Sequence, residues 1–378
     1  MRILLIGEYS RLHNSLKEGL LSLGHEVLLM GSGDGFKKFP VDIKLGRRFE
    51  KGASKKLKLV LLQLFGFDIS EYVLRRDFKK IAPKLKNFDV VQLINESPFQ
   101  TSPTLELEIA TYLRRNNKKI FLLSCSTDHI SVSFAFAKKI QPSIFTPFFE
   151  GKVDKNQIAA AIKYLLPEYK KLHVNLLNII DGIIASDLDY HLPLLEHPKY
   201  LGLIPNPINT DKIKAIPLSR QKSEKTIIFH GINRINYYKK GNDLFEAALK
   251  IIAEKYPDQV EIITAENLPY SEYIIKYDRA HILLDQNYAQ DQGYNALEAM
   301  AKGKVVFTGA GQNFCTHYNL ATDTVAINTK RTAKEIAEEL ENLIEKPERL
   351  QEISRRARRF IEQHHDYKKI AKTYLSIW

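Results

Sequence analysis

The sequence predicts an α/β fold made of two doubly wound parallel sheets that face each other across a cleft. Three observations lead to this prediction. The chain has 378 residues, more than one hydrophobic core usually holds. Short apolar strands alternate with helical patterns from the N-terminus onward, and the same alternation begins again after residue 225. The composition, 44% hydrophobic and 26% charged, is that of an ordinary soluble α/β protein.

The first domain is expected to span residues 1–204. It opens with an apolar strand that ends at Gly7, a helix at 14–23 and a second strand at 26–30, which is the start of a doubly wound sheet. The glycine-rich stretch 31–35 follows the second strand and leads into no clear helix, so we interpret it as a loop. The later elements of this domain are strands at 89–94, 119–124 and 182–186, a helix at 104–116, and loops and helices through 130–177.

The second domain is expected to span residues 205–365, after a proline-punctuated linker. Asn242 or Asp243 is predicted to cap the helix that follows its first strand. The remaining chain, 366–378, is a final helix. The predicted strands are 226–229, 260–264, 281–284, 305–308 and 324–327, and the predicted helices are 242–253, 270–277, 332–345 and 347–363, together with one that opens at Gly293.

The stretch 280–309 is where the sequence most strongly indicates a binding site. A strand, a polar loop and a helix that opens at Gly293 bring free backbone N–H groups to the carboxyl edge of the sheet. Such a helix terminus attracts anions. Glu298, about one turn into the helix, is expected to face the same pocket and to accept hydrogen bonds from sugar hydroxyls. The alternative is a plain βαβ unit with Glu298 in solvent.

Two further clusters lie where open α/β sheets bind ligands. Asp128 and His129 follow the strand 119–124, and we expect them at the site rather than in an Asx-type turn with an exposed histidine. Arg234 and Lys240 lie on a glycine loop after the strand 226–229. Fixed cations beside a helix terminus suit a diphosphate and its departure in a reaction. The alternative is that Lys239 and Lys240 are ordinary surface lysines.

The net charge of +12 is partly local. Lysines and arginines crowd residues 37–86 around the apolar run 57–67. This pattern is compatible with an anionic membrane surface, with a phosphate-bearing substrate, or with a solvated face, and we assign most of the charge to a solvated face. No nucleic-acid motif accompanies the charge, so no nucleic-acid partner is expected. The basic residues concerned are Lys37, Lys38, Lys44, Arg47, Arg48, Lys51, Lys55, Lys56, Lys58, Arg75, Arg76, Lys79, Lys80, Lys84 and Lys86.

Several classes of protein are excluded or disfavoured. No apolar run is long enough to span a membrane, and the first one is too short for a signal peptide, so we expect a cytoplasmic protein. Cys125 and Cys315 are too few for a disulfide framework. The sequence has no phosphate-binding P-loop, no zinc-ligand spacing and no Gly-x-Ser-x-Gly elbow.

Four motifs, in this order along the chain, make the second half of the sequence similar to a known family. They are IPNPINT at 204–210, Gly231-x2-Arg234-x5-Lys240-Gly241, Gly293-x3-LEAMA-x-G-x-VV at 293–306, and FIE-x-HHDY at 360–367. With these motifs the second half resembles the GT-B glycosyltransferases, most closely glycosyltransferase family 4 and the group-1 transferases of bacterial polysaccharide and lipopolysaccharide assembly. The first half matches only in its opening glycine loop and strand order.

The resemblance implies an enzyme that moves a sugar from a UDP- or GDP-sugar to a hydroxyl of a glycan or lipid-linked acceptor. It implies retention of anomeric configuration, no metal and no cofactor, and a final helix that crosses back to the first domain. An enzyme of this kind would be cytoplasmic, with peripheral contact at the inner face of the plasma membrane as a further possibility.

The resemblance also assigns roles to single residues. Arg234 and Lys240 would hold the donor diphosphate, Glu298 the ribose, and Asp128 and His129 would act toward sugar and acceptor. The other donor-side positions are Gly7 from the first domain, Glu266, Asn267 and Leu268 near the nucleobase, and Gly293, Tyr294 and Asn295 at the phosphate or sugar.

One position departs from the family pattern. The first of the family's paired glutamates, which contacts the donor sugar, corresponds to the position eight before Glu298, and this chain has Gln290 there, followed by Asp291. Two alternatives stay open, and the departure motivates the first of them. One is a non-catalytic subunit that binds a sugar nucleotide or glycan, and the other is an epimerase or phosphorylase on the same fold.

Overall fold

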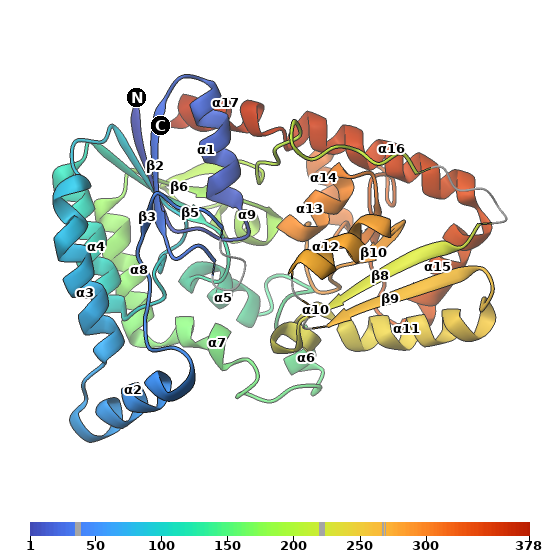
Figure 1. The fold of residues 1–378 in the computed structure, drawn as a ribbon, viewed down its shortest axis with the longest axis horizontal. Helices are drawn as coiled ribbons and strands as arrows, with labels where there is room; N and C mark the ends of the chain where they lie inside the picture. Colours follow the sequence, from blue (N-terminus) through green and yellow to red (C-terminus); the bar gives the residue numbers. More distant parts are fainter. Residues whose placement is uncertain (35–38, 219–223, 267, 269) are drawn as a thin grey trace.

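The computed structural model describes residues 1–34, 39–218, 224–266, 268 and 270–378. Gly35, Lys37, Lys38 and Asn267, which the sequence analysis singled out, lie outside these residues. The chain forms two parallel sheets with helices on both faces, side by side in Figure 1. The predicted fold class, two doubly wound α/β domains, is confirmed.

The first sheet has seven strands, all paired in parallel, in the order β3-β2-β1-β4-β5-β6-β7. Successive side chains of β1 point to opposite faces. Ile3 and Leu5 therefore pack with α1, whereas Leu4 and Ile6 pack with α3, α4 and α8. The strands are β1 Arg2–Ile6, β2 Glu26–Gly31, β3 Ile43–Lys44, β4 Val90–Leu93, β5 Lys119–Ser124, β6 Gly182–Ala185 and β7 Tyr200–Leu203.

The helices of this domain include several short ones that the sequence analysis left as an undivided region. They are α1 Leu12–Ser22, α2 Gly52–Phe65, α3 Ile69–Ile81, η2 Ala82–Lys84, α4 Pro103–Asn116, α5 His129–Phe136, α6 Thr146–Phe149, α7 Ala159–Ile162, η3 Lys163–Leu165, α8 Pro167–Ile179 and α9 Leu188–Leu194.

The second sheet has five parallel strands in the order β12-β11-β10-β8-β9. Helices α11 and α15 cover one face, and α12 and α13 cover the other. The strands are β8 Thr226–Ile232, β9 Val260–Glu266, β10 Ile282–Leu284, β11 Val305–Thr308 and β12 Ile327–Asn328. The helices are η4 Arg234–Asn236, α10 Tyr237–Lys240, α11 Asn242–Lys255, α12 Tyr270–Arg279, α13 Tyr294–Ala301, α14 Gln312–Tyr318, α15 Ala333–Glu345 and α16 Pro347–His364.

Two local predictions in the second domain are corrected, and one helix was missed. The cap of α11 is Gly241, whose φ of 73° suits a glycine. Asn242 is instead the first helical residue, and its Oδ1 lies 2.8 Å from His230 Nε2. The strand expected at 324–327 is only Ile327–Asn328, and α14 was not predicted, because a seven-residue helix has too short an apolar period to recognise.

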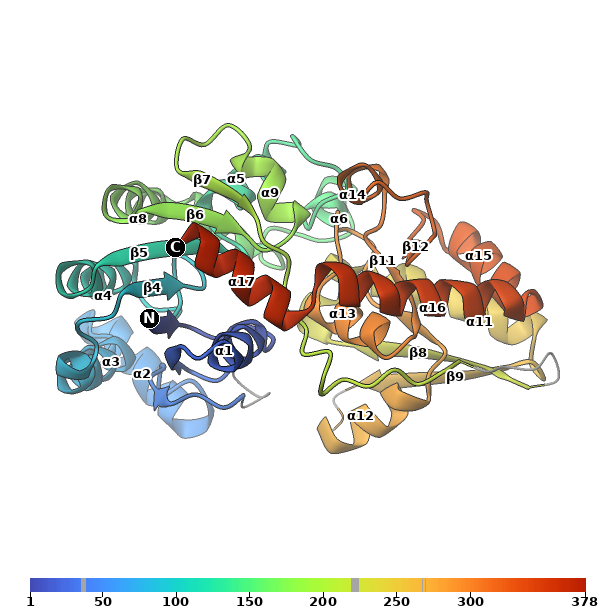
Figure 2. The same ribbon diagram turned by 90° about the horizontal axis from the view of Figure 1, so that it is seen from above.

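The two domains are joined twice. The linker and the α16–α17 connection lie beside each other, since Ile208 N donates to His365 O at 2.7 Å and Tyr367 N donates to Ile208 O at 3.1 Å. Helix α17, Tyr367–Ile377, then crosses back and packs on α1, as Figure 2 shows. Trp378 anchors its end through a 3.1 Å bond from Nε1 to Gln92 Oε1. All strands of the first sheet lie within 1–204 and all those of the second within 205–365.

Candidate functional site

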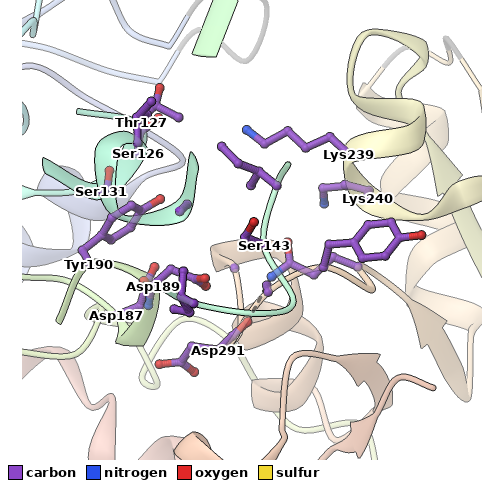
Figure 3. Close-up of a pocket in the computed structure, with 18 of the residues that line it drawn as sticks. Ser126, Thr127, Ser131, Ser143, Asp187, Asp189, Tyr190, Lys239, Lys240 and Asp291 are labelled. Atoms are coloured by element: carbon purple, nitrogen blue, oxygen red, sulfur yellow. Dashed lines mark hydrogen bonds between the residues drawn. The ribbon is translucent and has the colours of Figure 1, made fainter. Parts of the chain in front are cut away.

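A pocket of about 200 Å³ lies between the carboxyl edges of the two sheets. Figure 3 shows side chains from both domains pointing into it. The first domain contributes Ser126, Thr127, Ser131, Ser143, Asp187, Asp189 and Tyr190, and the second contributes Lys239, Lys240, Asp291 and Gly293.

The second domain supplies the positive side of the pocket. Lys239 extends across the cleft in Figure 3, and Lys240 Nζ donates to the buried carboxylate of Asp285 at 3.0 Å. Gly293 is the N-cap of α13, so the first N–H groups of that helix lie at the pocket wall. Asn295 Nδ2 also donates to Asp285 Oδ1, at 3.3 Å. Lys240 and Asn295 are therefore connected through Asp285, and the predicted role of Lys240 and Gly293 as an anion site stays a prediction.

The first domain supplies a carboxylate side that the sequence analysis missed. Asp187 and Asp189 follow β6, with Asp187 as the N-cap of α9, and Asp291 meets them from the second domain. Burial, together with the charge on Asp291, raises the pKa of Asp189 to about 7, and burial raises the pKa of Asp291 to about 6. The pKa of Asp187 is raised well above its usual value by burial and by its two neighbours. Near neutral pH these carboxyls can therefore donate as well as accept hydrogen bonds.

Residues 290 and 291 connect the domains across this pocket. Gln290 N donates to Asp189 Oδ2 at 3.1 Å, and Leu188 N donates to Asp291 Oδ2 at 3.3 Å. The Gln290 side chain donates to Pro142 O at 2.8 Å and accepts from Asn313 Nδ2 at 2.8 Å. The position that departs from the family pattern thus holds the two domains together, and its side chain does not line the pocket.

The raised pKa of Asp189 predicts a pH effect on stability. A folded-state pKa above the unfolded value means that the folded protein binds the proton more tightly. This stabilisation is complete below pH 3.8 and is lost as the pH rises toward about 7. We expect the melting temperature of Asp189→Asn to fall less over this range than that of the parent. The Asp258→Asn variant, at an exposed carboxyl, is the control, and equal slopes for Asp189→Asn and the parent would contradict the prediction.

Asp128 and His129 have structural partners close to the pocket. Asp128 is the N-cap of α5, with its Oδ1 accepting from Ser131 N at 2.8 Å and its other oxygen from Ser124. His129 Nδ1 lies 2.8 Å from Tyr164 O. Neither side chain lines the pocket, whereas Ser126 and Thr127 immediately before them do. The expected role of Asp128 and His129 toward sugar and acceptor stays a prediction.

Arg234 and Glu266 are paired with each other. Arg234 donates to both carboxylate oxygens of Glu266, at 2.7 and 2.6 Å, on the exposed rim of the second domain. This pair raises the pKa of Arg234 and lowers that of Glu266. Neither residue lines the pocket, so Arg234 must leave Glu266 to reach a diphosphate. Leu268 is half-buried and packs against the main core of the domain.

The other predicted donor-side residues are divided between the interface and the core. Tyr294 points to the first domain, with its hydroxyl 2.6 Å from that of Ser15 and donating to Pro207 O at 3.0 Å. Glu298 is half-buried on α13 and does not line the pocket. Gly7 ends β1 with a φ of 88°, close to Ile94, so any side chain there would clash. The roles of these residues at the donor stay predictions.

A signal for the missed residues was present in the sequence. Asp187 and Asp189 directly follow a predicted strand, as Asp128 does, and the carboxyl ends of parallel strands meet at one edge. Among the described residues, no group of three histidine, cysteine or acidic side chains is arranged to hold a metal ion.

Comparisons with known proteins agree with this arrangement. Residues 236–376 match a family model described as "Glycosyl transferase-like". No curated protein sequence matches the chain. Among solved structures, HepE of Anabaena in complex with UDP and glucose is similar with a TM-score of 0.59 and 14% identity, covering 100% of this chain and 98% of that one.

Two further structures show how widely the fold is used. Sucrose-phosphate synthase from Thermosynechococcus elongatus has a TM-score of 0.58 and 14% identity, with 100% and 98% coverage. A putative UDP-N-acetylglucosamine 2-epimerase from Listeria monocytogenes has a TM-score of 0.53 and 12% identity, with 99% and 94% coverage. These findings confirm the GT-B fold and the resemblance to glycosyltransferases that the sequence predicted.

Proposed function

On the basis of the glycosyl transferase-like match over residues 236–376, we propose that the protein transfers a sugar from a nucleotide-diphosphate sugar to a hydroxyl of a glycan or lipid-linked acceptor. The observation that carries the proposal is the interdomain pocket, where Lys239, Lys240 and the start of α13 oppose the carboxyls of Asp187 and Asp189. The similar HepE structure is a complex with UDP and glucose, which supports a UDP-sugar first and a GDP-sugar second.

The proposed chemistry follows from the two sides of the pocket. The diphosphate lies against Lys240 and the N-terminus of α13, where fixed positive charge stabilises the leaving group as the glycosidic bond breaks. The sugar lies toward Asp189 and Asp291, whose raised pKa values let them donate to or accept from its hydroxyls. The enclosing domains exclude water, so that the acceptor hydroxyl rather than water receives the sugar.

We further propose, from the resemblance to glycosyltransferases, that transfer retains the anomeric configuration. We also propose that it needs no metal, because Lys240 and the helix terminus supply the positive charge that a metal otherwise brings. Proton NMR of the first product tests the configuration. Turnover after removal of divalent cations with EDTA tests the metal independence, which fails as a proposal if activity is lost with EDTA and returns with Mg²⁺ or Mn²⁺.

The experiment that tests the function is a thermal-shift panel with UDP, GDP, ADP, CMP and NAD, followed by turnover of the corresponding sugar nucleotides. A selective shift with UDP or GDP, and release of that nucleotide only when an acceptor is present, supports transfer. Selective binding without turnover favours the non-catalytic subunit, and interconversion of the donor sugar without an acceptor favours an epimerase. No shift with any nucleotide contradicts the transferase and the epimerase, and favours a non-catalytic subunit that binds a glycan.

Arg234 supplies a matched test of the donor-side assignment. We expect Arg234→Ala to weaken binding of the selected nucleotide about tenfold or more, because a charge-assisted contact to phosphate is lost. The melting temperature should change little, because the pair with Glu266 is exposed to solvent. Arg279→Ala is the control, since Arg279 forms a similar exposed pair with Glu261 at 2.8 Å on another part of the same domain. Equal nucleotide affinity for both variants would remove Arg234 from the donor site.

A further inference from the structure

Helix α2 buries a lysine and exposes its large apolar side chains, the reverse of a helix that packs on a hydrophobic core. Within α2 the buried side chain is that of Lys58, which is bonded to Glu50 Oε1 at 2.7 Å. The large apolar side chains are instead exposed, Leu64 at 70% and Phe65 at 73%. The other exposed apolar residues of this segment are Leu57, Leu59, Val60, Leu62 and Phe67. So many exposed large apolar side chains on one short segment of a protein surface indicate an interaction site.

The position of α2 leaves this patch open. The helix projects from the edge of the first domain, at the lower left of Figure 1, far from the second domain. It packs on α3 and is held there by the Lys58–Glu50 pair, with Ser70 Oγ also donating to Glu50 Oε1 at 3.2 Å. Leu57, Val60 and Leu64 recur at helical spacing and so form one outward stripe.

The charge around α2 identifies what covers the patch. The helix contains no acidic residue. Within the described part of the chain, the ammonium groups of Lys51, Lys55 and Lys56 have no carboxylate partner, whereas Arg47, Arg48 and Lys58 are all paired. On α2 and the residue before it, these three lysines therefore carry positive charge that no neighbouring carboxylate among the described residues neutralises. A second copy of the chain would bring the same unpaired lysines face to face, which is unfavourable.

We propose that α2 lies in the plane of an anionic lipid surface. The stripe of Leu57, Val60 and Leu64 enters the boundary between headgroups and acyl chains, together with Phe65 at the helix end. Lys56, beside the stripe, reaches the lipid phosphates on its long stem, and Lys51 and Lys55, farther around the helix, add to the positive charge near the surface. Among the described residues, no helix has the length and apolar character needed to cross a bilayer, so this contact is to one face of the membrane.

This inference goes beyond the proposed transfer reaction and does not depend on it. It is tested by titrating the purified full chain with vesicles of phosphatidylcholine and phosphatidylglycerol, and with vesicles of phosphatidylcholine alone. The expected result is binding to the anionic vesicles that weakens as salt is raised. Binding to neutral vesicles of equal strength, or no binding to anionic vesicles at low salt, overturns the proposal.

Variants of exposed residues locate the contact. The double variant Leu64→Ser with Phe65→Ser should lower the partition coefficient at least about tenfold, because two large apolar side chains no longer leave water. Lys55→Glu with Lys56→Glu should lower it by about fivefold or more per lysine. Ile275→Ser, at a residue 65% exposed on α12, and Lys250→Glu on α11 are the matched controls and should bind as the parent does. Unchanged binding of the Leu64 and Phe65 variant would contradict the proposal.

Two more measurements separate lipid from protein as the occupant. When anionic vesicles are added, the tryptophan fluorescence of Phe65→Trp should shift to shorter wavelength and be quenched by brominated acyl chains. The buried Trp378 supplies a constant background emission. Sedimentation of the parent without lipid should show no dimer that forms through this patch. Such a dimer would be recognised because the double variant Leu64→Ser with Phe65→Ser dissociates it. If such a dimer is found, a second copy covers the patch and the lipid proposal is wrong.

Discussion

The Lys240→Ala variant is expected to lose turnover by about 10²- to 10³-fold, the range seen when one preorganised group that stabilises developing charge is removed. Lys240 lines the interdomain pocket beside Lys239 and faces the start of α13, where we place the leaving diphosphate. The measurement is kcat with the sugar nucleotide selected by the thermal-shift panel. Lys250→Ala, which changes an exposed lysine on α11, should retain full turnover.

A loss of activity in Lys240→Ala must be separated from a loss of structure. Lys240 Nζ is the cation beside the buried Asp285, and Asp285 Oδ2 has no hydrogen-bond partner among the described residues. Removal of the Lys240 ammonium group should therefore lower the free energy of unfolding by about 1–3 kcal/mol. Adding Asp285→Asn removes the unpaired charge and should restore stability without restoring turnover. If turnover returns with stability, Lys240 acts through the fold and not on the diphosphate.

The Gly7→Ala variant is expected to destabilise the first domain by about 2–5 kcal/mol. The backbone of Gly7 has a φ of 88°, which costs an L-residue about 1–2 kcal/mol. In addition, the new Cβ would lie 2.3 Å from Cγ2 of Ile94, a fully buried side chain, and overpacking of this kind costs about 1–3 kcal/mol. Since total stabilities are about 5–15 kcal/mol, urea unfolding should detect the change easily.

Gly24→Ala is the control for the clash. Gly24 has a similar φ of 82°, but no atom lies within 4 Å of the added Cβ. It should therefore cost only the conformational part, about 1–2 kcal/mol. Equal losses for the two variants would show that the contact with Ile94 is not what requires glycine at the end of β1.

The elements that the sequence predicted well are those with a strong local pattern. The strands β5 and β11 begin and end where their apolar runs do, at 119–124 and 305–308, and the long amphipathic helices α15 and α16 were placed within one residue at each end. Short elements were missed or misplaced, including α14, β12 and the small helices between α5 and α8, because a few residues carry too little period to be distinguished from loops.

The sequence by itself determined the fold class and the position of Lys240 and Gly293 at the carboxyl edge of the second sheet, since both lie within local strand–loop–helix units. Only the tertiary structure decided which distant residues meet. It paired Arg234 with Glu266 on the rim, made Asp128 a helix cap, and brought Asp187 and Asp189 to Asp291 across the cleft. It also exposed the apolar residues of α2 while burying Lys58. The physical reason is that burial and charge pairing depend on neighbours far apart in the chain, which no local pattern specifies.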